Sequence, residues 1–506
     1  MNSSDTSRLS VLLSRGKLSR KVHQLDGIIW CLDKERRGIL LDYGSNSKWL
    51  RGGVIADEMG LGKTFQMLGT MICNFLPHSL LVVPLILVDQ WVSVFKLITG
   101  HVPFVYHGNV KKVTLDVLKS KPIVITTYGM ISKLDGLLHK MKWNRVVYDE
   151  AHHLRNSSTS ISKGAQHLKC SIKWLITGTP IQNKVNDFYT LCETLGLPKE
   201  YYKRKRNIPG LVKTFILRRT KREVGIDLPR LNIYNRLVSW RNYEERKLAQ
   251  DLHSLVRLKS ITEDESDTTS HSQSDSECED SSDDFTMAPT ALDAVFSGAM
   301  PLVLFLKARQ VCIFPKLLTG SFKGAGQMGG SDWSNYNAGV TQSSKLDVVV
   351  STIAKRRDND KKKLIFCHFK KEIDELVSRL TELGFNLSVV DGRVSKSLRD
   401  TILTNKTLDI LILQVQTACE GLNLQQFSEV YFVSPHWNPA IEDQAIARCH
   451  RMGQENSVDI FKFQMDDIKD PETETSIPTI EYYVAGVQTR KRHLLNTLMN
   501  PDVEEP

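Results

Sequence analysis

The sequence predicts an α/β fold with two lobes, each a parallel sheet flanked by helices. Its 506 residues are too many for one ordinary core and suggest two or three domains. Short β-branched runs alternate with helical stretches in two separate parts of the chain. Because an acidic, serine-rich run stands between these parts, we expect the two sets of strands to form two separate sheets.

The first lobe is expected over residues 15–230, after an N-terminal tail at residues 1–14. Helical stretches separate its β-branched runs, which is typical of a parallel sheet. The runs are LLVVP (80–84), IVITTY (123–128), RVVYDE (145–150) and WLITGTP (174–180). Each run ends at a polar or glycine-containing turn. Since parallel sheets bind ligands at the carboxyl ends of their strands, these turns are candidate site positions.

The second lobe is expected over residues 343–500, followed by a short tail at 501–506. Its predicted strands are KLIFCHF (363–369), LSVVDG (387–392), LDILILQ (408–414), EVYFVSP (429–435) and SVDIFKF (457–463). Residues 231–342 form the connecting region. Within it we expect a disordered linker at about 260–285, because this acidic, serine-rich stretch has too few apolar residues to form a core.

Charge is unevenly distributed along the chain. The formal net charge is +10, yet residues 260–285 hold ten acidic residues and no Lys or Arg, which leaves +20 elsewhere. A basic protein favours an anionic partner, nucleic acid first, although a solubilising surface explains the charge as well. Ser274, Ser276 and Ser282 precede acidic residues and are candidate phosphorylation sites, with a passive spacer as the simpler interpretation.

Cysteine usage and hydropathy indicate a soluble intracellular protein. The nine cysteines stand far apart without a CxxC pair, so a zinc module or a disulfide framework is not expected. The N-terminus has no apolar core of signal-peptide length. The longest apolar run, residues 80–88, is interrupted by Pro84 and is about half the length of a membrane span.

A glycine-rich turn in GGVIADEMGLGKTFQML (52–68) has the features of a phosphate-binding loop. An apolar run enters Gly60-Leu61-Gly62, and the chain leaves through Lys63 and Thr64 into a helical stretch. Backbone N–H groups at the start of a helix can hold a phosphate, Lys63 adds a cation, and the Thr64 hydroxyl can bind magnesium. Asp57 takes the first position, where many such loops have glycine. A chance GKT sequence is the alternative.

Two adjacent carboxylates, Asp149 and Glu150, follow the strand RVVYDE and precede Ala151 and His152. At the carboxyl end of a strand, Asp149 can hold magnesium while Glu150 orients an attacking water molecule. A charged turn after a buried strand is the alternative. The phosphate-binding loop upstream favours the catalytic interpretation.

Two further stretches are candidates for sensing or stabilising a transferred phosphate. Thr177-Gly178-Thr179-Pro180, followed by Gln182 and Asn183, can sense a γ-phosphate, although a plain turn explains these residues nearly as well. Residues 443–454 are predicted to form a helix on which Arg448 and Arg451 share one face. Guanidinium groups delivered across an interface stabilise charge on a phosphoryl group, whereas an exposed, salt-bridged helix is the alternative.

Taken together, these residues resemble helicase superfamily two, and more narrowly the SWI/SNF-type ATPases. The motifs stand in family order and cover about residues 15–500. They are VHQLDGIIW (22–30), DEMGLGKT (57–64), DEAH (149–152), LITGTPIQN (175–183), FILRRTKREV (215–224), WNPAIEDQAIARCHRMGQ (437–454) and TIE (479–481). In QVQTACEGLNL (414–424), Ala418 and Cys419 stand where the family usually has two glycines.

The resemblance implies that ATP binds with magnesium between two RecA-like lobes. The implied nucleotide-binding residues are Gln24, which would read adenine, and Asp57, Glu58, Met59, Gly60, Leu61, Gly62, Lys63 and Thr64. The implied catalytic residues are Lys63, Asp149, Glu150, Arg448 and Arg451. The implied magnesium ligands are Thr64 and Asp149.

The resemblance also implies that duplex DNA lies across both lobes. The implied DNA-facing segments are residues 84–91, 106–108, 126–128 and 417–423, whose hydroxyls, amides and turns suit phosphate contacts without sequence readout. Three basic clusters are candidate nuclear-localisation signals or DNA contacts, with a solvated face as the alternative for each. These clusters are residues 203–206, residues 355–357 together with 361–363, and residues 490–492.

We therefore expect a DNA-stimulated ATPase that acts as a double-stranded DNA translocase or remodeler and affects transcription. It is expected to be a monomeric motor in the nucleus, or in the host nucleus if viral, with nucleosomes or transcription proteins as further candidate partners. Two alternatives remain. One is a strand-separating DNA or RNA helicase, because the DEAH sequence occurs there too. The other is a scaffold that binds ATP and DNA and recruits transcription factors through its acidic segment.

Overall fold

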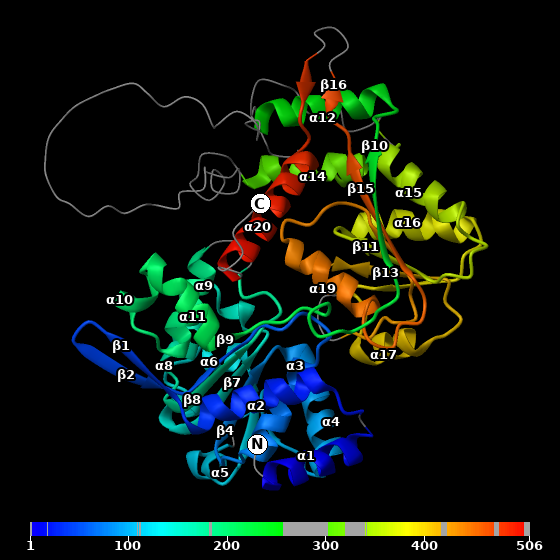
Figure 1. The fold of residues 1–506 in the computed structure, drawn as a ribbon. Helices are drawn as coiled ribbons and strands as arrows, with labels where there is room; N and C mark the ends of the chain where they lie inside the picture. Colours follow the sequence, from blue (N-terminus) through cyan, green and yellow to red (C-terminus); the bar gives the residue numbers. More distant parts are fainter. Residues whose placement is uncertain are drawn as a thin grey trace, which may run out of the picture.

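The protein folds into two α/β lobes, which lie one above the other in Figure 1. The computed structural model describes residues 3–17, 19–108, 110, 113–181, 185–256, 302–318, 340, 342–415, 422–469 and 475–499. The acidic segment at 260–285, Gln182 and Asn183, and Ala418 and Cys419 lie outside these ranges. Among the described helices, none combines the length and the apolar run that crossing a bilayer requires.

Lobe 1 is built on a seven-stranded sheet in which all neighbouring strands run parallel. The strand order across this sheet is β5-β6-β4-β7-β8-β3-β9. The strands are β3 (Gly52–Ile55), β4 (Ser79–Val83), β5 (Phe104–Tyr106), β6 (Ile123–Thr127), β7 (Trp143–Asp149), β8 (Cys170–Ile176) and β9 (Ile216–Leu217). The predicted runs at 80–84, 123–128, 145–150 and 174–180 are therefore confirmed as neighbouring strands.

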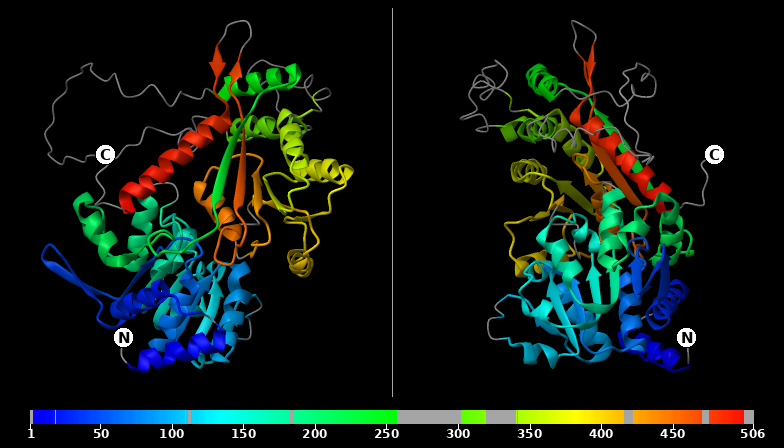
Figure 2. Two further views of the ribbon diagram at one scale, coloured as in Figure 1. Left: turned by 45° about the vertical axis from the view of Figure 1, so that its right-hand side comes forward. Right: turned by 90° about the vertical axis from the view of Figure 1, so that its left-hand side faces the viewer.

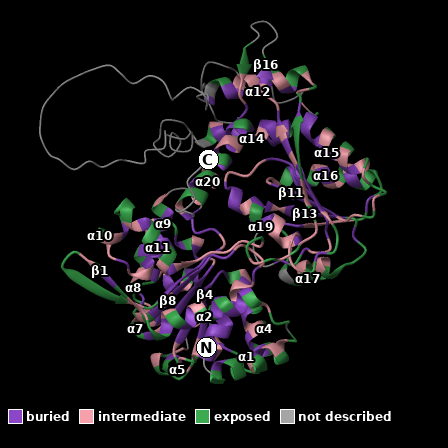
Figure 3. Ribbon diagram, in the orientation of Figure 1, coloured by how far each residue is buried: buried purple, intermediate pink, exposed green. Residues whose placement is uncertain are grey.

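Helices cover both faces of the lobe 1 sheet (Figures 1 and 3). Alternate strand residues face two cores: Leu81 and Val147 belong to one cluster, Leu80 and Val146 to the other. The first core is closed by α1 (Ser3–Gly16), α2 (Val22–Arg36), α3 (Lys63–Cys73) and α4 (Val88–Thr99). Toward the other face and the end of the sheet lie α5 (Leu115–Lys119), α6 (Tyr128–Ile131), α7 (Leu137–Lys140), α8 (Ser160–His167), α9 (Val185–Leu195), α10 (Lys199–Tyr202) and α11 (Ile208–Phe215).

Two features of lobe 1 differ from the sequence-based expectation. Helix α1 crosses the expected boundary at residue 14, and its Leu9 and Leu12 are buried in the core against α3, so packed structure begins before residue 15. An antiparallel hairpin of β1 (Ile39–Tyr43) and β2 (Asn46–Leu50) projects from the lobe between α2 and β3 (Figure 2). The sequence pattern of this stretch did not predict a hairpin.

Lobe 2 contains a six-stranded parallel sheet with the order β10-β15-β14-β11-β13-β12. The strands are β10 (Leu231–Val238), β11 (Lys363–Cys367), β12 (Leu387–Val390), β13 (Ile410–Gln414), β14 (Glu429–Phe432) and β15 (Val458–Met465). All five predicted strands are present. The sixth, β10, was expected in the connecting region, but it pairs with β15 along its whole length and closes one edge of the sheet.

Helices also cover both faces of the lobe 2 sheet. They are α12 (Tyr243–Val256), α14 (Leu302–Ile313), α15 (Ser344–Ala354), α16 (Lys370–Glu382), α17 (Lys396–Thr404), α19 (Pro439–Cys449) and α20 (Ile480–Met499). A small antiparallel pair, β16 (Ile468–Lys469) and β17 (Ser476–Ile477), follows β15. Because α12 and α14 contribute to the same core as β11 and β15, both flanks of the expected connection belong structurally to lobe 2.

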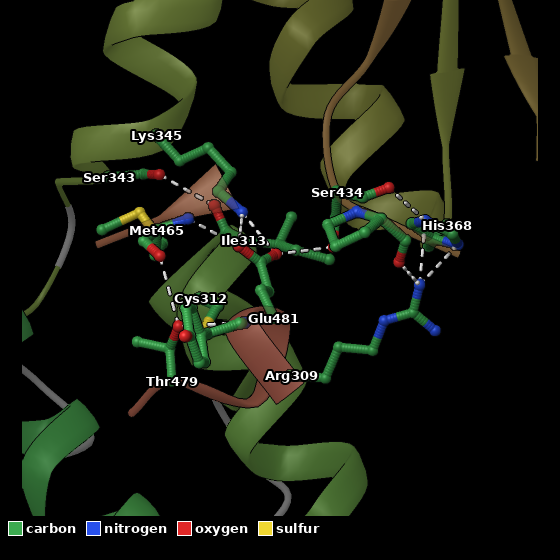
Figure 4. Close-up of polar contacts among 12 residues, drawn as sticks. Arg309, Cys312, Ile313, Ser343, Lys345, His368, Ser434, Met465, Thr479 and Glu481 are labelled. Carbon is green, nitrogen blue, oxygen red and sulfur yellow. Dashed lines mark hydrogen bonds and ion pairs between the residues drawn. The ribbon is translucent and has the colours of Figure 1, made fainter. Parts of the chain in front are cut away.

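Helix α20 links the two lobes. Near its start, Glu481 is buried in lobe 2 and forms an ion pair with the buried Lys345 of α15, as Figure 4 shows. The same carboxylate accepts hydrogen bonds from the Ser434 hydroxyl (2.6 Å) and the Met465 backbone N–H (2.7 Å). At its other end, Leu494 and Met499 join a lobe 1 core formed by α9 and α11. The helix therefore spans the lobe boundary (Figure 2).

Candidate active site

The glycine-rich loop connects β3 to α3 and is shaped by two glycines with positive φ. Gly60 has a φ of 92° and Gly62 a φ of 84°, a backbone region that side chains disfavour. At Gly62 a Cβ would also lie only 2.3 Å from the Gln24 Nε2 atom. Because Lys63 is the first residue of α3, the loop's N–H groups lie at a helix N-terminus, which favours an anion.

Lys63 lies at the centre of the site. Its Nζ donates a hydrogen bond to the Asp57 carbonyl (2.8 Å). Burial lowers the pKa of Lys63, and so to a smaller extent does Arg448, whereas the carboxylates of Glu150, Asp57 and Asp149 act in the opposite direction. A cation held among carboxylates and partly removed from water is suited to bind a polyphosphate.

The turn after β8 packs directly on this loop. A Cβ at Gly178 would lie 2.8 Å from Met59 Cε and 3.4 Å from Lys63 Nζ. Thr177 is buried, and its hydroxyl oxygen accepts a hydrogen bond from the Thr179 N–H (3.1 Å), which keeps the turn compact. The structure thus brings together the loop and the 177–180 stretch that the sequence predicted as a possible phosphate sensor.

The carboxylates of Asp149 and Glu150 lie at the end of β7, on the same edge of the sheet as the loop. Asp149 is 6% exposed and accepts hydrogen bonds from Trp91 Nε1 (2.7 Å) and the Glu150 N–H (3.0 Å). Glu150 has a φ of 51°, a strained backbone conformation for a non-glycine residue. Such a conformation persists only where the surrounding structure maintains it, and it is typical of functional positions.

The two carboxylates have opposite electrostatic environments. Burial, followed by the charge of Glu150, raises the pKa of Asp149 to about 7. Burial alone would raise the pKa of Glu150 too, but His152, Lys63 and Arg448 together lower it to about 2. The His152 Nδ1 lies 3.3 Å from Glu150 Oε2. Glu150 is therefore held ionised, whereas for Asp149 the charge of Lys63 offsets only part of the effect of burial.

Lobe 2 supplies two arginines to this site. Arg448 lies on α19 and acts electrostatically on both Lys63 and Glu150. A Cβ on Gly60 would lie 3.7 Å from Arg451 Cβ, which places Arg451 against the glycine-rich loop. Burial and the charge of Arg448 lower the pKa of Arg451. The predicted helix over 443–454 is wrong in extent, because α19 ends at Cys449 and Arg451 lies in the following turn.

Gln24 and its neighbour His23 contact the loop from α2. Both Gln24 Nε2 (3.1 Å) and His23 Nε2 (3.2 Å) lie within hydrogen-bonding distance of the Leu61 carbonyl. Helix α2 is fixed to the sheet by Glu35, whose buried carboxylate accepts hydrogen bonds from Arg145 Nε (2.6 Å) and Trp174 Nε1 (2.8 Å). The adenine-reading role of Gln24 stays a prediction.

Arg219 is a site residue to which the sequence analysis assigned no role. Its guanidinium forms a two-pronged ion pair with the fully buried carboxylate of Asp57, at 3.1 and 2.6 Å. Arg219 also donates to the His23 carbonyl (2.7 Å), so it joins the loop to α2. Asp57 was expected to bind nucleotide, but its carboxylate is occupied by Arg219 and Gln66 (2.9 Å).

The adjacent Glu58 is tied to the segment that leads toward lobe 2. Its carboxylate accepts from the Lys221 N–H (2.8 Å) and lies 3.2 Å from Lys221 Nζ. Lys221 Nζ also donates to the His450 carbonyl of lobe 2 (3.2 Å). The residues that make these contacts lie far apart in sequence, so no local pattern predicts them. The only signal in the sequence is the group of basic residues in FILRRTKREV.

Several residues in the expected DNA-facing segments are buried and used internally. Trp91 (1% exposed) bonds to Asp149, and the Thr126 hydroxyl donates to the Tyr106 carbonyl (2.8 Å). The Tyr128 hydroxyl donates to the Asp149 carbonyl (2.6 Å). These side chains are therefore engaged within lobe 1, and the DNA-facing role of the segments stays a prediction. The residues of these segments that reach the surface include Leu85, Gln90, His107 and Gly108.

The side chains of the three basic clusters differ in their exposure and in the ion pairs that they form within the protein. In the second, Arg356 pairs with Glu429 (2.6 Å), Lys361 pairs with Asp459 (2.9 Å), and Lys363 is buried. These side chains form ion pairs at the lobe 2 sheet, which differs from a nuclear signal, a DNA contact and a solvated face alike. In the third, Arg492 pairs with Asp443 (2.9 Å). All four residues of the first cluster, 203–206, are exposed on lobe 1, where they follow α10 and enter η3 (Lys205–Asn207).

One parallel-sheet lobe carries a phosphate-binding loop and an acidic pair, and the other supplies arginines. This arrangement defines a two-lobed nucleoside triphosphatase of the helicase type. The SNF2-related domain family matches residues 23–291, and the helicase conserved C-terminal domain matches residues 344–453. The chain belongs to the SNF2-related family of ATP-dependent helicase-superfamily enzymes, and the predicted RecA-like lobes are confirmed.

Relatives include proteins of very different lengths. The probable global transactivator of Orgyia pseudotsugata multicapsid polyhedrosis virus is 27% identical, with 94% of this chain and 91% of that protein covered. This match agrees with the compact length and the PHWNPAIEDQAIARCHR sequence, which resemble the baculoviral global transactivator. An uncharacterized ATP-dependent helicase of Mycoplasma pneumoniae is 26% identical, with coverage of 96% and 45%.

The chain spans less than half the length of several relatives that it matches, including 34% of a Danio rerio DNA excision repair protein ERCC-6-like, at 26% identity over 85% of this chain. Among solved structures, the Sulfolobus solfataricus SWI2/SNF2 ATPase core in complex with dsDNA is 24% identical. That match covers 89% of this chain and 88% of the solved chain, with a TM-score of 0.38.

Proposed function

We propose that this protein is a DNA-stimulated ATPase that translocates on double-stranded DNA, remodels bound protein and thereby affects transcription. The observation that carries the proposal is the convergence of Arg448 and Arg451 of lobe 2 on the loop around Lys63 in lobe 1. Because the arginines and the loop belong to different lobes, ATP bound there would couple hydrolysis to movement of the lobes.

The residues of this site suit the binding of ATP together with magnesium. Lys63 would neutralise the phosphates, Glu150 would orient the attacking water, and Gln24 would contact adenine. Magnesium would be held by Thr64 and Asp149, with phosphate oxygens and water completing its shell. Asp149 fits this role because it is a buried carboxylate whose pKa is raised to about 7. A bound divalent cation would offset the free-energy cost of ionising this carboxylate. Within the described residues, no cluster of three or more His, Cys, Asp or Glu offers an all-protein metal cage.

The partner would be duplex DNA, bound through its backbone with little sequence preference, by a monomeric motor acting in the nucleus. Outside residues 260–285 the chain carries a formal charge of +20, which suits a polyanion. The exposed cluster at 203–206 is a candidate for nuclear import or for a backbone contact. Nucleosomes and transcription proteins are candidate cargoes of the motor.

The test is ATP turnover of the full chain with and without duplex DNA, beside Lys63→Ala and Glu150→Gln. Duplex DNA is expected to raise the rate, the stimulation should weaken steeply with salt, and both variants should lose at least about a hundredfold in turnover. A rate that ignores DNA would contradict the proposal. Strand displacement of a labelled duplex would instead favour a helicase, and loss of function on deleting residues 260–285 would favour a scaffold.

A further inference from the structure

A buried arginine, Arg309 of α14, lies against the chain that enters α19. Arg309 is 7% exposed. Its Nη2 donates to the Pro435 carbonyl (2.9 Å) and lies 2.9 Å from His368 Nε2 (Figure 4). The guanidinium also lies 5.3 Å from the centre of the Trp437 ring, within the range of a cation–π contact. Because His368 follows β11 and Pro435 follows β14, Arg309 holds the ends of two neighbouring strands.

Aromatic rings complete the packing around this guanidinium. Phe305, one turn before Arg309 on α14, stacks on Trp437 with ring centroids 4.3 Å apart. His368 stacks on His436 at 5.7 Å. Burial, followed by the charge of Arg309, lowers the pKa of His368 well below its usual value, so a neutral imidazole lies beside the guanidinium. Helix α14 therefore contacts the segment 435–437 through both a ring and a cation.

The start of α19 is also fixed from β15 and α20. Glu442, in the first turn of α19, is 1% exposed. Its carboxylate accepts hydrogen bonds from Lys462 Nζ of β15 (2.6 Å) and Gln488 Nε2 of α20 (2.7 Å). Lys491 Nζ of α20 donates to the Trp437 carbonyl (3.1 Å). Three elements thus fix the start of α19, and Arg309 is the contact from α14.

The direction of α19 matters because Arg448 lies at its far end. Since α19 spans 11 residues, Arg448 lies about 14 Å along the axis from Pro439. A tilt of about 5° at the start of the helix would move Arg448 by about 1 Å, and a displacement of that size can reduce a rate by about a hundredfold. Arg448 is the group of this helix that acts on Lys63 and Glu150.

We propose that Arg309 is a positioning residue for ATP hydrolysis, because it fixes the chain between β14 and α19 and thereby places Arg448. This inference rests on the proposed function, since it requires that Arg448 acts on the transferred phosphoryl group. A guanidinium suits the task because its planar group stacks on a ring and donates hydrogen bonds at the same time. An ammonium group carries the same charge but cannot stack in this way.

Two variants separate the charge of Arg309 from its shape. Arg309→Lys keeps the charge without the planar group, and Arg309→Met removes the charge. The matched control is Arg356→Met, because the Arg356 guanidinium also lies over a ring in lobe 2, 4.9 Å from the centre of Phe461, and pairs with Glu429 (2.6 Å). Glu429 is the first residue of β14, so this contact lies at the other end of the strand from α19.

The full chain is assayed with duplex DNA for single-turnover ATP hydrolysis and for the Kd of a fluorescent ATP analogue. Both Arg309 variants should lose at least about tenfold in hydrolysis rate, because Arg448 is displaced. Analogue Kd should stay within about twofold, since Arg448 would act on charge that develops in the transition state. Arg356→Met should keep its hydrolysis rate.

A double-variant cycle tests whether Arg309 acts through Arg448. When Arg448→Ala is already present, adding Arg309→Met should reduce the hydrolysis rate by less than about a further twofold, because the group that it positions is gone. A merely structural role of Arg309 would instead lower the rate by the same factor in both backgrounds. Thermal melting of each variant accompanies the rates, and Arg309→Lys decides if Arg309→Met does not fold.

Full hydrolysis in both Arg309 variants would overturn the inference. So would a loss that multiplies in full with that of Arg448→Ala, or an equal loss in Arg356→Met. If the unsubstituted chain does not hydrolyse ATP, or if Arg448→Ala keeps the full rate, the proposed function fails instead. The two failures are therefore distinguishable.

Discussion

Arg219 and Asp57 form the contact on which the shape of the glycine-rich loop depends. The Asp57 carboxylate is 0% exposed, and both of its oxygens are paired with the Arg219 guanidinium. The Asp57 carbonyl in turn accepts the Lys63 hydrogen bond. A side chain 162 positions away in sequence therefore determines where the loop holds its lysine.

Replacing Arg219 with Met should destabilise lobe 1 by about 3–5 kcal/mol, because a buried carboxylate is left without its cation. ATP-analogue binding should weaken as well, since the loop loses its anchor. Denaturant unfolding and analogue Kd measure the two effects. Asp57→Asn and the double variant complete a cycle, in which a coupling energy below about 0.5 kcal/mol would show that the pair does not fix the loop.

At the scale of single elements, two buried polar contacts hold lobe 2 helices in place. Lys345 of α15 and Glu481 of α20 are both fully enclosed and pair with each other (Figure 4). On α12, His253 is 1% exposed and faces Cys312 of α14 at 3.7 Å. The first contact depends on charge, whereas the second requires a neutral imidazole.

Glu481→Gln should cost about 3 kcal/mol or more of stability, because Lys345 remains buried without a carboxylate. Adding Lys345→Met should recover part of this loss, since it removes the unpaired charge. The exposed pair of Arg492 and Asp443 provides the matched control, and Asp443→Asn should change stability by less than about 1 kcal/mol. Equal losses in Glu481→Gln and Asp443→Asn would contradict this account.

His253 should make the protein sensitive to mild acid. Burial lowers the pKa of His253 from 6.5 to about 4, so its neutral form stabilises the fold fully above pH 6.5. That contribution, at most about 3 kcal/mol, is lost as pH falls from 6.5 to 4. Urea midpoints against pH should therefore fall less steeply for His253→Gln. Glu245 on the same helix, whose pKa burial raises to about 6, acts in the opposite direction but cancels in this comparison.

How much of the structure could be predicted from the sequence depends on how far apart in the chain the interacting residues lie. The loop and the acidic pair each occupy one short stretch beside a strand, so local patterns identified them. Strand β10 was missed because its partner β15 lies more than 200 residues later. Trp91 was expected at the surface, because a strand end indicates where a helix begins but not which of its side chains face inward. Arg219 could be found only through its distant partner.

At the scale of the whole molecule, the site is shared between the lobes. Lys63, Asp149 and Glu150 belong to lobe 1, whereas Arg448 and Arg451 come from lobe 2. Helix α20 crosses the same boundary, with Glu481 buried in one lobe and Leu494 packed on the other. The site is therefore complete only when the two lobes are packed against each other.

Substituting Arg448 or Arg451 with Ala should reduce ATP turnover by about a hundredfold or more while ATP-analogue binding to lobe 1 changes little. The reason is that these guanidinium groups would act on charge that develops during phosphoryl transfer rather than on the bound ground state. Turnover and analogue Kd are measured on the same preparations, with Arg492→Ala as a control that removes a cation near α19 without reaching the loop. If either arginine variant keeps full turnover, that arginine does not take part in hydrolysis. If both lose analogue binding in parallel with turnover, they hold ATP in place, and the case for hydrolysis controlled by lobe closure is lost.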